Sequence, residues 1–471
     1  MKEYEKKMVD VLLEAIDKNY INEETIGQFT YDYLAALLHT TMLLENGKNF
    51  YLQIKSYLEQ ITLTRIRKQE KIVVGFIVNY SSTWIGDELY NLLDNSEKFE
   101  PYIFLMANYN GQNERMVCEE YEENLIFFKK RRFRIVGTLN LEDGRLYTWE
   151  EIGVKPDICI WTTPWMGLFQ PQYRIEKYSL DILHTYIPYG YLLAENKEST
   201  FVYDQYNQLI HNIAWKIFEC TAMDVKMAQK YSFVGNASAC YTGYPKMDKF
   251  YQYEKDGEGI WGKLEKKSGN RKAKRIIYAP HHSIEDEGIV SFSTFQYNYR
   301  FMLELAKKYK NETIWIIKPH PQLKYKAIRT GVFENEEEWK EYIDSWKGLK
   351  NAYVMEEGDY KDLFLYSDAM ILDSISFLAE YLYVDKPGLL LCRREQYFND
   401  IGKLIKDVYY QADGKSEKEI QKFVAEIVIG NKDYKGKERE KLFKENMDYK
   451  NMTGKTAAEN IYDILKNMVI L

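Results

Sequence analysis

The sequence predicts an α/β protein built from parallel β-sheets. Runs of apolar, largely β-branched residues alternate with polar segments of helical length, which is the pattern of repeated βαβ units. The first run, KIVVGFIV at 71–78, is apolar at nearly every position, as expected for a strand that is buried on both faces. Further runs follow at 101–106, 133–139 and 157–163, and the alternation resumes from Arg275. The order of elements therefore predicts two α/β halves.

The length of the chain favours more than one domain, because a single hydrophobic core rarely serves 471 residues. Residues 1–70 carry apolar residues at helical spacing and show no strand-like alternation, so they predict a helical extension. We expect this extension either to pack on the main domain or to contact a membrane or a partner. The predicted boundaries are a helical extension at 1–70, a first α/β domain at 71–250, a polar linker at 251–274, a second α/β domain at 275–445 and a C-terminal helix at 446–471.

The composition argues against several classes of protein. A formal net charge of −7 disfavours a broad basic surface, so we expect no nucleic-acid partner. The five cysteines are scattered without CxxC spacing, which predicts neither a zinc site nor a disulfide framework. No apolar window approaches the about 18 residues of a membrane-spanning helix, and the N-terminus does not resemble a signal peptide. We therefore expect a cytoplasmic protein.

One basic and aromatic segment is compatible with binding to a membrane surface. FFKKRRFR at 127–134 places four consecutive cations between aromatic side chains, as segments at a lipid interface do. The alternative is a solvated helix end that leads into the next strand. A peripheral contact with the inner face of the cell membrane is thus one of two interpretations of this segment.

Polar side chains follow three predicted strands in the second half of the chain. The segments are RIIYAPHHSI at 275–284, TIWIIKPHPQL at 313–323 and SDAMILDSISFLAE at 367–380. The polar side chains at the three strand ends are His281, His282, Lys318, His320, Asp373, Ser374 and Ser376. In an open parallel sheet the ligand crevice lies outside the carboxyl ends of the strands. We therefore expect these side chains to meet at one ligand site.

The turn that leads into the helix after Ser374 is suited to bind an anion. Free backbone N–H groups and the helix dipole point at such a ligand, and the hydroxyls of Ser374 and Ser376 add donors. The alternative is ordinary N-capping by Ser376 or Asp373, which is worth about 1 kcal/mol. Lys318 adds a positive charge on the neighbouring strand end, and Glu380 could accept hydrogen bonds from ribose hydroxyls. The pattern predicts a nucleotide site.

These motifs resemble those of the CDP-glycerol glycerophosphotransferase family, which builds teichoic-acid and capsular glycerol-phosphate polymers. Its members carry a strand ending in YAP, a KPHP loop and an SD…ITDYSS motif before a helix and a KP strand, together with a G-x-P-x-x-D stretch. The corresponding segments are YAPHH at 278–282, KPHP at 318–321, SD…ILDSIS at 367–376, KPG at 386–388 and TGYPKMD at 242–248. The resemblance covers residues 180–400, so the extension at 1–70 lies outside it.

The resemblance implies a GT-B fold, in which two Rossmann-like parallel-sheet domains face a cleft. The C-terminal domain would hold the CDP group, and the N-terminal domain would present the acceptor. His320 would bind the pyrophosphate and is also a candidate catalytic residue. The residues expected around the nucleotide and its phosphates are His281, Lys318, His320, Asp373, Ser374, Ser376 and, at the ribose, Glu380.

The family activity would move glycerol phosphate from CDP-glycerol to a hydroxyl of a cell-surface polysaccharide or teichoic-acid-type acceptor, a glycan or a lipid-linked polymer. The acceptor hydroxyl would attack the β-phosphorus in line, and CMP would depart. Two alternatives stay open. The chain could be a GT-B glycosyltransferase that uses a nucleotide sugar in capsule or surface-glycan synthesis, or a degenerate GT-B scaffold without activity.

The reaction needs a general base, and histidine suits this role because its pKa lies near neutral pH. The family's WHG motif is replaced here by LHTYIPYG at 183–190, so we predict His184 as the base. His282 is the second candidate, because a loop on the donor domain can reach across a closed cleft. The family's DYSS has also become DSIS, which moves one hydroxyl.

The absence of one metal-binding motif bears on whether the protein uses a metal. The chain contains no Asp-x-Asp, which metal-dependent GT-A transferases use to hold a nucleotide diphosphate. The charge on the leaving group would then be met by a helix N-terminus, lysine and histidine. We therefore predict that the protein uses neither a metal nor a cofactor.

Overall fold

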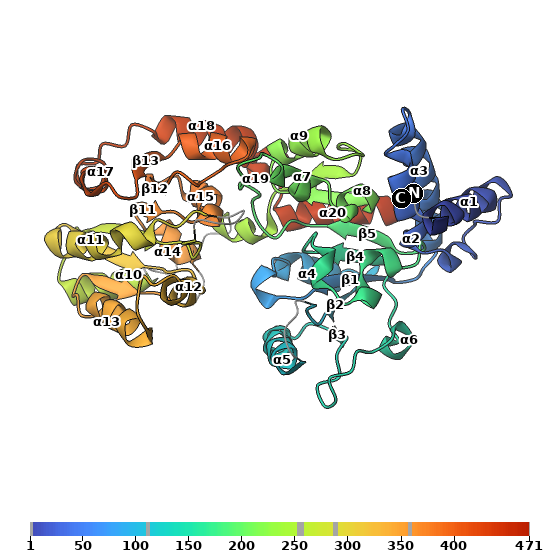
Figure 1. Ribbon diagram of the computed structural model, residues 1–471, viewed down its shortest axis with the longest axis horizontal. Helices are drawn as coiled ribbons and strands as arrows, with labels where there is room; N and C mark the ends of the chain where they lie inside the picture. Colours follow the sequence, from blue (N-terminus) through green and yellow to red (C-terminus); the bar gives the residue numbers. More distant parts are fainter. Residues whose placement is uncertain (1–2, 110–113, 252–258, 286–290, 357–359, 471) are drawn as a thin grey trace. The chain divides into compact units, whose positions relative to one another are not determined.

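The computed structural model describes residues 3–109, 114–251, 259–285, 291–356 and 360–470 (Figure 1). The chain divides into two compact units. Unit 1 comprises Met1–Gly190, Tyr203–Lys246 and Tyr449–Leu471, and unit 2 comprises Tyr191–Val202 and Met247–Asp448. Each unit contains one β-sheet whose neighbouring strands are all parallel, which confirms the predicted α/β class.

The sheet of unit 1 has seven strands in the order β3-β2-β1-β4-β5-β6-β7. Their bounds are β1 Ile72–Val78, β2 Phe99–Leu105, β3 Ile135–Gly137, β4 Ile158–Trp161, β5 Leu183–Tyr186, β6 Lys216–Glu219 and β7 Ala239–Tyr241. The order runs outward from β1 on one side and from β4 on the other, as in doubly wound Rossmann-like sheets. Strands β4 and β5 are buried at every position, as expected for central strands of a parallel sheet.

Unit 1 also contains the helical extension. The described α-helices of unit 1 are α1 Glu3–Asp17, α2 Tyr31–Thr41, α3 Gly47–Arg67, α4 Asp87–Asp94, α5 Glu114–Lys130, α6 Trp149–Ile152, α8 Leu209–Ile213, α9 Ala222–Tyr231, α19 Tyr449–Thr453 and α20 Ala457–Ile470. The division between the units falls within α7 Phe201–Tyr206. Leu12, Leu37 and Tyr51 of the extension share one hydrophobic core with Trp161 of β4 and Tyr186 of β5. The extension therefore packs on the sheet through its apolar helix faces.

Unit 2 has six strands in the order β10-β9-β8-β11-β12-β13. Their bounds are β8 Lys274–Ala279, β9 Thr313–Ile317, β10 Ala352–Val354, β11 Ala369–Leu372, β12 Gly388–Cys392 and β13 Tyr410–Asp413. The described helices are α10 Gly259–Ser268, α11 Phe295–Lys308, α12 Leu323–Arg329, α13 Glu336–Lys347, α14 Lys361–Leu365, α15 Ile375–Glu380, α16 Asp400–Asp407, α17 Glu417–Lys422 and α18 Gly436–Asn446. The strand order is again that of a Rossmann-like sheet, and its direction of progression reverses between β8 and β11.

Part of the stretch at 251–274, expected to be a linker, is helical. Residues 252–258 lie outside the described residues, and α10 follows them. Trp261 of α10 is fully buried, and its indole N–H donates a hydrogen bond to the carbonyl oxygen of Leu363 at 3.0 Å. One buried tryptophan thus fixes this helix within unit 2.

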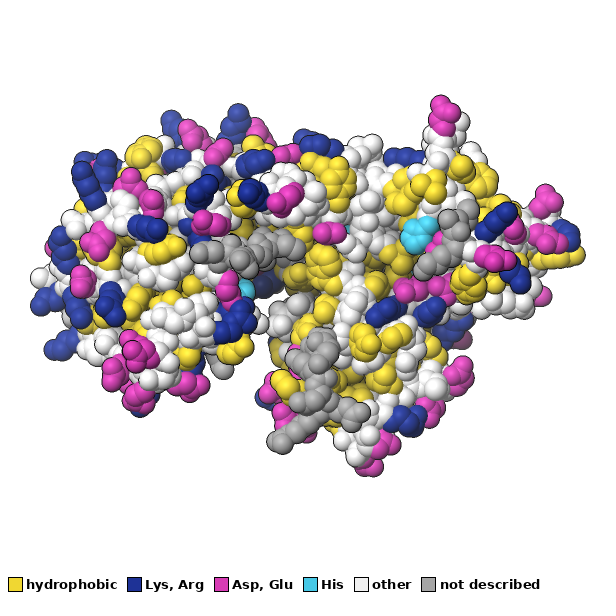
Figure 2. Space-filling view, in the orientation of Figure 1, with side chains coloured by type: hydrophobic (Ala, Val, Ile, Leu, Met, Phe, Trp, Pro, Cys, Tyr) yellow, Lys and Arg dark blue, Asp and Glu magenta, His cyan; other side chains and the backbone are white. Residues whose placement is uncertain are grey.

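The surface carries charges of both signs. Figure 2 shows Lys and Arg side chains mixed with Asp and Glu side chains over the visible face of each unit. This mixture fits a chain with 64 basic and 71 acidic residues. None of the helices that the structure describes is both long enough and apolar enough to cross a membrane.

Candidate nucleotide site

The three predicted motifs lie at the carboxyl ends of three adjacent strands in unit 2. Strand β8 pairs with β9 on one side and with β11 on the other. Past the strand ends, the backbone N–H of Lys318 donates to the carbonyl oxygen of Tyr278 at 2.8 Å, and that of His320 donates to Pro280 at 3.1 Å. These bonds extend the strand pairing into the two histidine-bearing loops. The site therefore spans the point between β8 and β11 where ligands bind in open α/β sheets.

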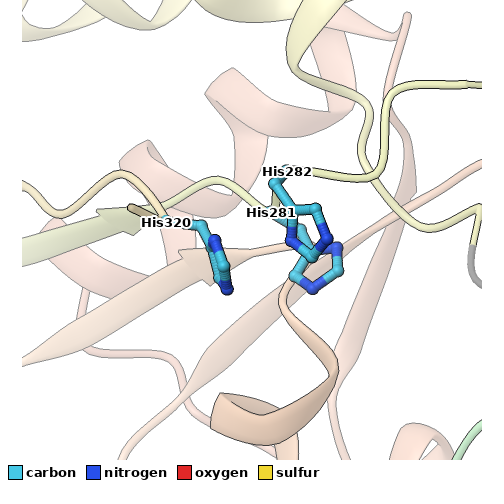
Figure 3. Close-up of side chains that lie close together, drawn as sticks. All are labelled: His281, His282 and His320. Atoms are coloured by element: carbon cyan, nitrogen blue, oxygen red, sulfur yellow. The ribbon is translucent and has the colours of Figure 1, made fainter. Parts of the chain in front are cut away.

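Three histidines from these two loops form a cluster (Figure 3). The ring centroid of His282 lies 4.2 Å from that of His281 and 4.2 Å from that of His320. One ring nitrogen of each histidine lies within 4.8 Å of the others, close enough that the three residues could hold a metal ion. The three histidines were expected at one ligand site because they follow neighbouring predicted strands, and the structure brings them together. The direct contact between their rings was not predicted.

Burial keeps all three rings neutral near pH 7. Desolvation, followed by repulsion from the other two histidines, lowers the pKa of His281 well below its usual value. Desolvation also lowers the pKa of His320 to about 4, with smaller contributions from His282 and Lys318. The pKa of His282 falls for the same main reason, and nearby Lys326 lowers it further. Neutral imidazoles can donate and accept one hydrogen bond each, so they can both bind phosphate and take up a proton.

Asp373 holds the loops around this cluster in place. One carboxylate oxygen accepts a hydrogen bond from the backbone N–H of His281 at 2.6 Å. The other accepts from the backbone N–H of Thr294 at 2.5 Å and from its hydroxyl at 2.9 Å. Burial raises the pKa of Asp373 to about 6, and these hydrogen bonds oppose the shift. The carboxylate, predicted as a nucleotide contact, is thus occupied by the protein's own donors.

The two serines are not engaged in capping helix α15. Ser374 occupies the N-cap position, but its side chain makes no capping hydrogen bond. Ser374 is buried and Ser376 is exposed, and no hydrogen bond of the Ser376 hydroxyl is found in the described part of the chain. The alternative was N-capping by Ser376 or Asp373, but Asp373 precedes the N-cap position and Ser376 lies inside the helix. Both remain candidates for contact with an anion.

Glu380 lies at the end of α15 and is almost fully buried. The hydroxyl of Tyr360 donates a hydrogen bond to its carboxylate. The ammonium group of Lys249 lies 4.3 Å from the ring centroid of Tyr360. The predicted ribose contact at Glu380 would require this buried carboxylate to become accessible.

His184 lies in unit 1, within the aromatic core beside β4. Its Nδ1 accepts a hydrogen bond from the indole N–H of Trp161 at 2.9 Å, and the rings of Tyr31 and Tyr178 contact it edge-on. The side chain is fully buried, and its Nε2 has no hydrogen-bond partner. Desolvation lowers the pKa of His184 to about 3. Because the ring is fully buried and its Nδ1 is already occupied, this conformation does not favour His184 as the base.

Comparisons with known proteins agree with the motifs. A sequence model described as "CDP-Glycerol:Poly(glycerophosphate) glycerophosphotransferase" matches residues 202–467, more than half of the chain. No curated protein matches the chain in a sequence comparison. Among solved structures, the wall teichoic acid polymerase TagF is similar with a TM-score of 0.53 and 11% identity, over 90% of this chain and 96% of that chain.

A UDP-GlcNAc 2-epimerase from Neisseria meningitidis, solved with UDP-GlcNAc bound, is similar with a TM-score of 0.52 and 15% identity. That match covers 84% of this chain and 100% of the epimerase chain. Likeness at this level of identity concerns the fold, and it confirms the predicted GT-B class. The family match covers the strands and loops that carry the three motifs. The chain belongs to the CDP-glycerol:poly(glycerophosphate) glycerophosphotransferase family.

Proposed function

We propose that this protein transfers glycerol phosphate from CDP-glycerol to a hydroxyl group of a surface-polymer acceptor and releases CMP. One observation carries the proposal most strongly. The histidine cluster, Lys318 and Ser374 all lie at the carboxyl ends of β9, β8 and β11, within the part of the chain that matches the family. A pyrophosphate placed there would meet a cation, neutral N–H donors and hydroxyl donors at once.

The chemistry of the proposed step follows from these groups. The acceptor oxygen forms a bond to the β-phosphorus, and the bond from that phosphorus to the oxygen of CMP breaks. Lys318 and the hydroxyls of Ser374 and Ser376 would stabilise the negative charge that moves onto CMP. We include in the proposal that the reaction uses no metal or cofactor, with Lys318 and the two hydroxyls as the groups that would neutralise this charge.

We propose only the chemical class of the acceptor, which is a polymer with a free hydroxyl group. A poly(glycerophosphate), a capsular glycan or a lipid-linked polymer each offers the free hydroxyl that the reaction requires. TagF, which shares the fold, is described as a wall teichoic acid polymerase. A teichoic-acid-type acceptor is therefore the first that we would test.

A peripheral membrane contact is a further part of the proposal. In the segment 127–134, Phe128 is fully buried, and the guanidinium of Arg131 lies over the ring of Phe127 and forms an ion pair with Asp87. The aromatic rings therefore pack mainly on the protein. The ammonium groups of Lys129 and Lys130 are exposed at the end of α5, where they could contact anionic lipid headgroups.

The test is a donor screen with purified protein and a glycerol-phosphate acceptor. Release of CMP from CDP-glycerol is expected, whereas a glycosyltransferase would release a nucleoside diphosphate from a nucleotide sugar. Lys318→Met should lower turnover and weaken CDP binding. Lys324→Met is the matched control, because this partly exposed lysine of α12 pairs with Glu336 outside the site. Turnover of a nucleotide sugar, with none of CDP-glycerol, would refute the proposed donor.

A further inference from the structure

Backbone amides fix the orientation of the proton on two rings of the histidine cluster. The N–H of Gln322 donates a hydrogen bond to Nδ1 of His320 at 3.2 Å. In the other loop, the N–H of Ser283 donates to Nδ1 of His281 at 3.3 Å. A neutral imidazole has one donor and one acceptor nitrogen, so a ring that accepts at Nδ1 carries its proton on Nε2. Both rings therefore present an Nε2–H group.

The hydroxyl of Ser283 reinforces this arrangement at His281. Its oxygen accepts a hydrogen bond from the backbone N–H of Phe292 at 3.0 Å, and it lies 2.7 Å from Nδ1 of His281. Because the backbone N–H of Ser283 already makes Nδ1 an acceptor, the Ser283 hydroxyl can donate its own proton to that nitrogen. Two donors then converge on Nδ1 of His281. The proton of this ring belongs on Nε2.

The same hydrogen bonds disfavour a metal ion in the cluster. A histidine that binds a metal through one nitrogen normally donates a hydrogen bond from the other, which keeps the coordinating nitrogen unprotonated. In His281 and His320 the second nitrogen accepts instead of donating. Their Nε2–H groups are suited to the oxygens of an anion, and hydrogen bonds to charged partners are among the stronger ones in proteins.

His282 differs from its two neighbours. Its ring contacts both of theirs, and no hydrogen bond fixes either of its nitrogens within the described residues. Nδ1 of His282 is buried without a partner, so Nε2 is the nitrogen that a substrate could reach in this partly exposed ring. Neither a backbone donor nor a carboxylate commits this ring to one tautomer.

We propose that His281 and His320 are neutral Nε2–H donors for the phosphates of the nucleotide donor, and that His282 is the general base. The inference rests on the proposed function, and it states which residue takes the proton of the acceptor hydroxyl in that reaction. His282 takes the proton of the acceptor hydroxyl as the oxygen attacks phosphorus and becomes an imidazolium. CMP departs as a phosphate monoester whose second pKa is near 6, so its oxygen needs no proton from the protein. The imidazolium then returns its proton to solvent.

The groups around His282 fit a base that works near neutral pH. His281 and His320 flank the ring and stay neutral, while Lys326 and Glu285 are its charged neighbours, with Lys318 beside His320. Lys326 forms an ion pair with Glu285 at 2.7 Å, and Arg329 pairs with the same carboxylate, so Glu285 offsets only part of the positive charge near His282. Bound phosphate would add negative charge beside the ring and favour its protonated form during turnover.

The first experiment reads the tautomers directly. ¹⁵N-labelled histidine spectra of the full chain, assigned with single His→Gln variants, distinguish a ring protonated at Nε2 from one protonated at Nδ1. We expect the Nε2–H form for both His281 and His320 at pH 7. An Nδ1–H form in either ring would overturn its role as a donor to phosphate.

The second experiment compares glutamine and alanine at each position. Glutamine keeps an N–H donor near the place of Nε2, whereas alanine does not. The affinity of His320→Gln for CDP should lie within about threefold of that of the wild type, whereas His320→Ala should bind CDP at least about 10-fold more weakly than the wild type. His282→Gln should keep its CDP affinity but lose about 100-fold or more in turnover of CDP-glycerol. His39→Gln, an exposed histidine on α2, is the control.

The outcomes separate the inference from the proposed function. Turnover by His282→Gln within 10-fold of the wild type would overturn the base assignment. Stoichiometric Zn²⁺ binding that is lost in His281→Gln and His320→Gln would overturn the donor assignment in favour of a metal site. A wild type that releases no CMP from CDP-glycerol would refute the proposed function and with it the base role. The tautomers and the CDP affinities would still decide whether the two donors are correctly assigned.

Discussion

The carboxylate of Asp373 accepts a hydrogen bond from the backbone N–H of His281, with a distance of 2.6 Å between the two atoms. Through its other oxygen, Asp373 also holds the backbone and the hydroxyl of Thr294 at the start of α11. A single buried carboxylate at the end of β11 thus positions the loop after β8. The placement of the histidine cluster depends on a residue that need not touch the substrate.

Asp373→Asn should therefore loosen the site. Asparagine offers one acceptor oxygen, and its NH₂ group would face an N–H donor of either His281 or Thr294. We expect the free energy of unfolding to fall by about 1.5–3 kcal/mol, the range for a lost hydrogen bond to a charged group. CDP binding, measured by calorimetry, should weaken as well. Asp344→Asn, at an exposed position of α13, should change neither quantity.

The ionisation of Asp373 also predicts a dependence of stability on pH. The pKa of Asp373 in the folded protein is raised to about 6 from an ordinary value of 3.8, so the folded state binds this proton more tightly than the unfolded state does. The stability contributed by this proton is fully present below pH 4 and is lost as the pH rises through 6. The free energy of unfolding of the wild type, relative to that of Asp373→Asn, should fall over this interval. A difference that rises instead would contradict the assignment.

The two serines should contribute to ligand affinity and not to stability. Because the side chain of Ser374 does not cap α15, removal of both hydroxyls should leave the free energy of unfolding unchanged. Ser374→Ala with Ser376→Ala should weaken CDP binding by about 1–3 kcal/mol if two hydrogen bonds to phosphate are lost. Unaltered affinity would show that the hydroxyls do not contact the nucleotide.

A genuine N-cap supplies the matched control for the serines. Asn335 accepts hydrogen bonds from the backbone N–H groups of Glu337 and Glu338 at the start of α13, both at 3.0 Å. Asn335→Ala should lower the free energy of unfolding by about 1 kcal/mol and leave CDP affinity intact. Together the two variants separate capping from ligand binding.

The sequence predicted the elements of unit 2 and the polar residues at its strand ends. Apolar runs ending in polar loops were enough to place His281, Lys318 and Ser374 at the carboxyl ends of strands. It did not determine the order of the strands. The loops meet because β8 lies between β9 and β11, and that arrangement arises from pairing between distant segments.

Two residues show why the rest of the site could not be predicted. His184 was expected at a strand end, yet β5 begins at Leu183 and ends at Tyr186, so His184 is the second residue of a buried strand. Glu380 was expected to face the ligand one turn into its helix, but Tyr360, 20 residues earlier in the chain, packs against it and donates to its carboxylate. Strand boundaries and distant packing partners leave no local pattern in the sequence.

The proposed membrane contact can be tested at the exposed lysines of α5. Each cation near an anionic bilayer contributes about 1 kcal/mol to binding, so Lys129→Glu with Lys130→Glu should weaken association with phosphatidylserine vesicles by about 30-fold or more. Sedimentation with vesicles measures this, and turnover of a soluble acceptor should persist. Lys307→Glu with Lys310→Glu, near the end of α11, is the control. Association that is equal in both double variants would refute a contact through α5.

The last prediction concerns His184 and acid stability. Burial lowers the pKa of His184 to about 3, so the folded state excludes a proton that the unfolded chain binds below pH 6.5. Its contribution to stability is therefore lost as the pH falls below 6.5, by about 2 kcal/mol between pH 7 and pH 5. In His184→Phe this pH-dependent loss should disappear, although the unpaired indole N–H of Trp161 should lower stability at every pH. Urea unfolding of both proteins at pH 7 and pH 5 measures the effect, with His39→Gln as the control at an exposed site. The acidic limb of the pH–rate profile should persist in His184→Phe, and its loss in a folded variant would restore His184 as the base.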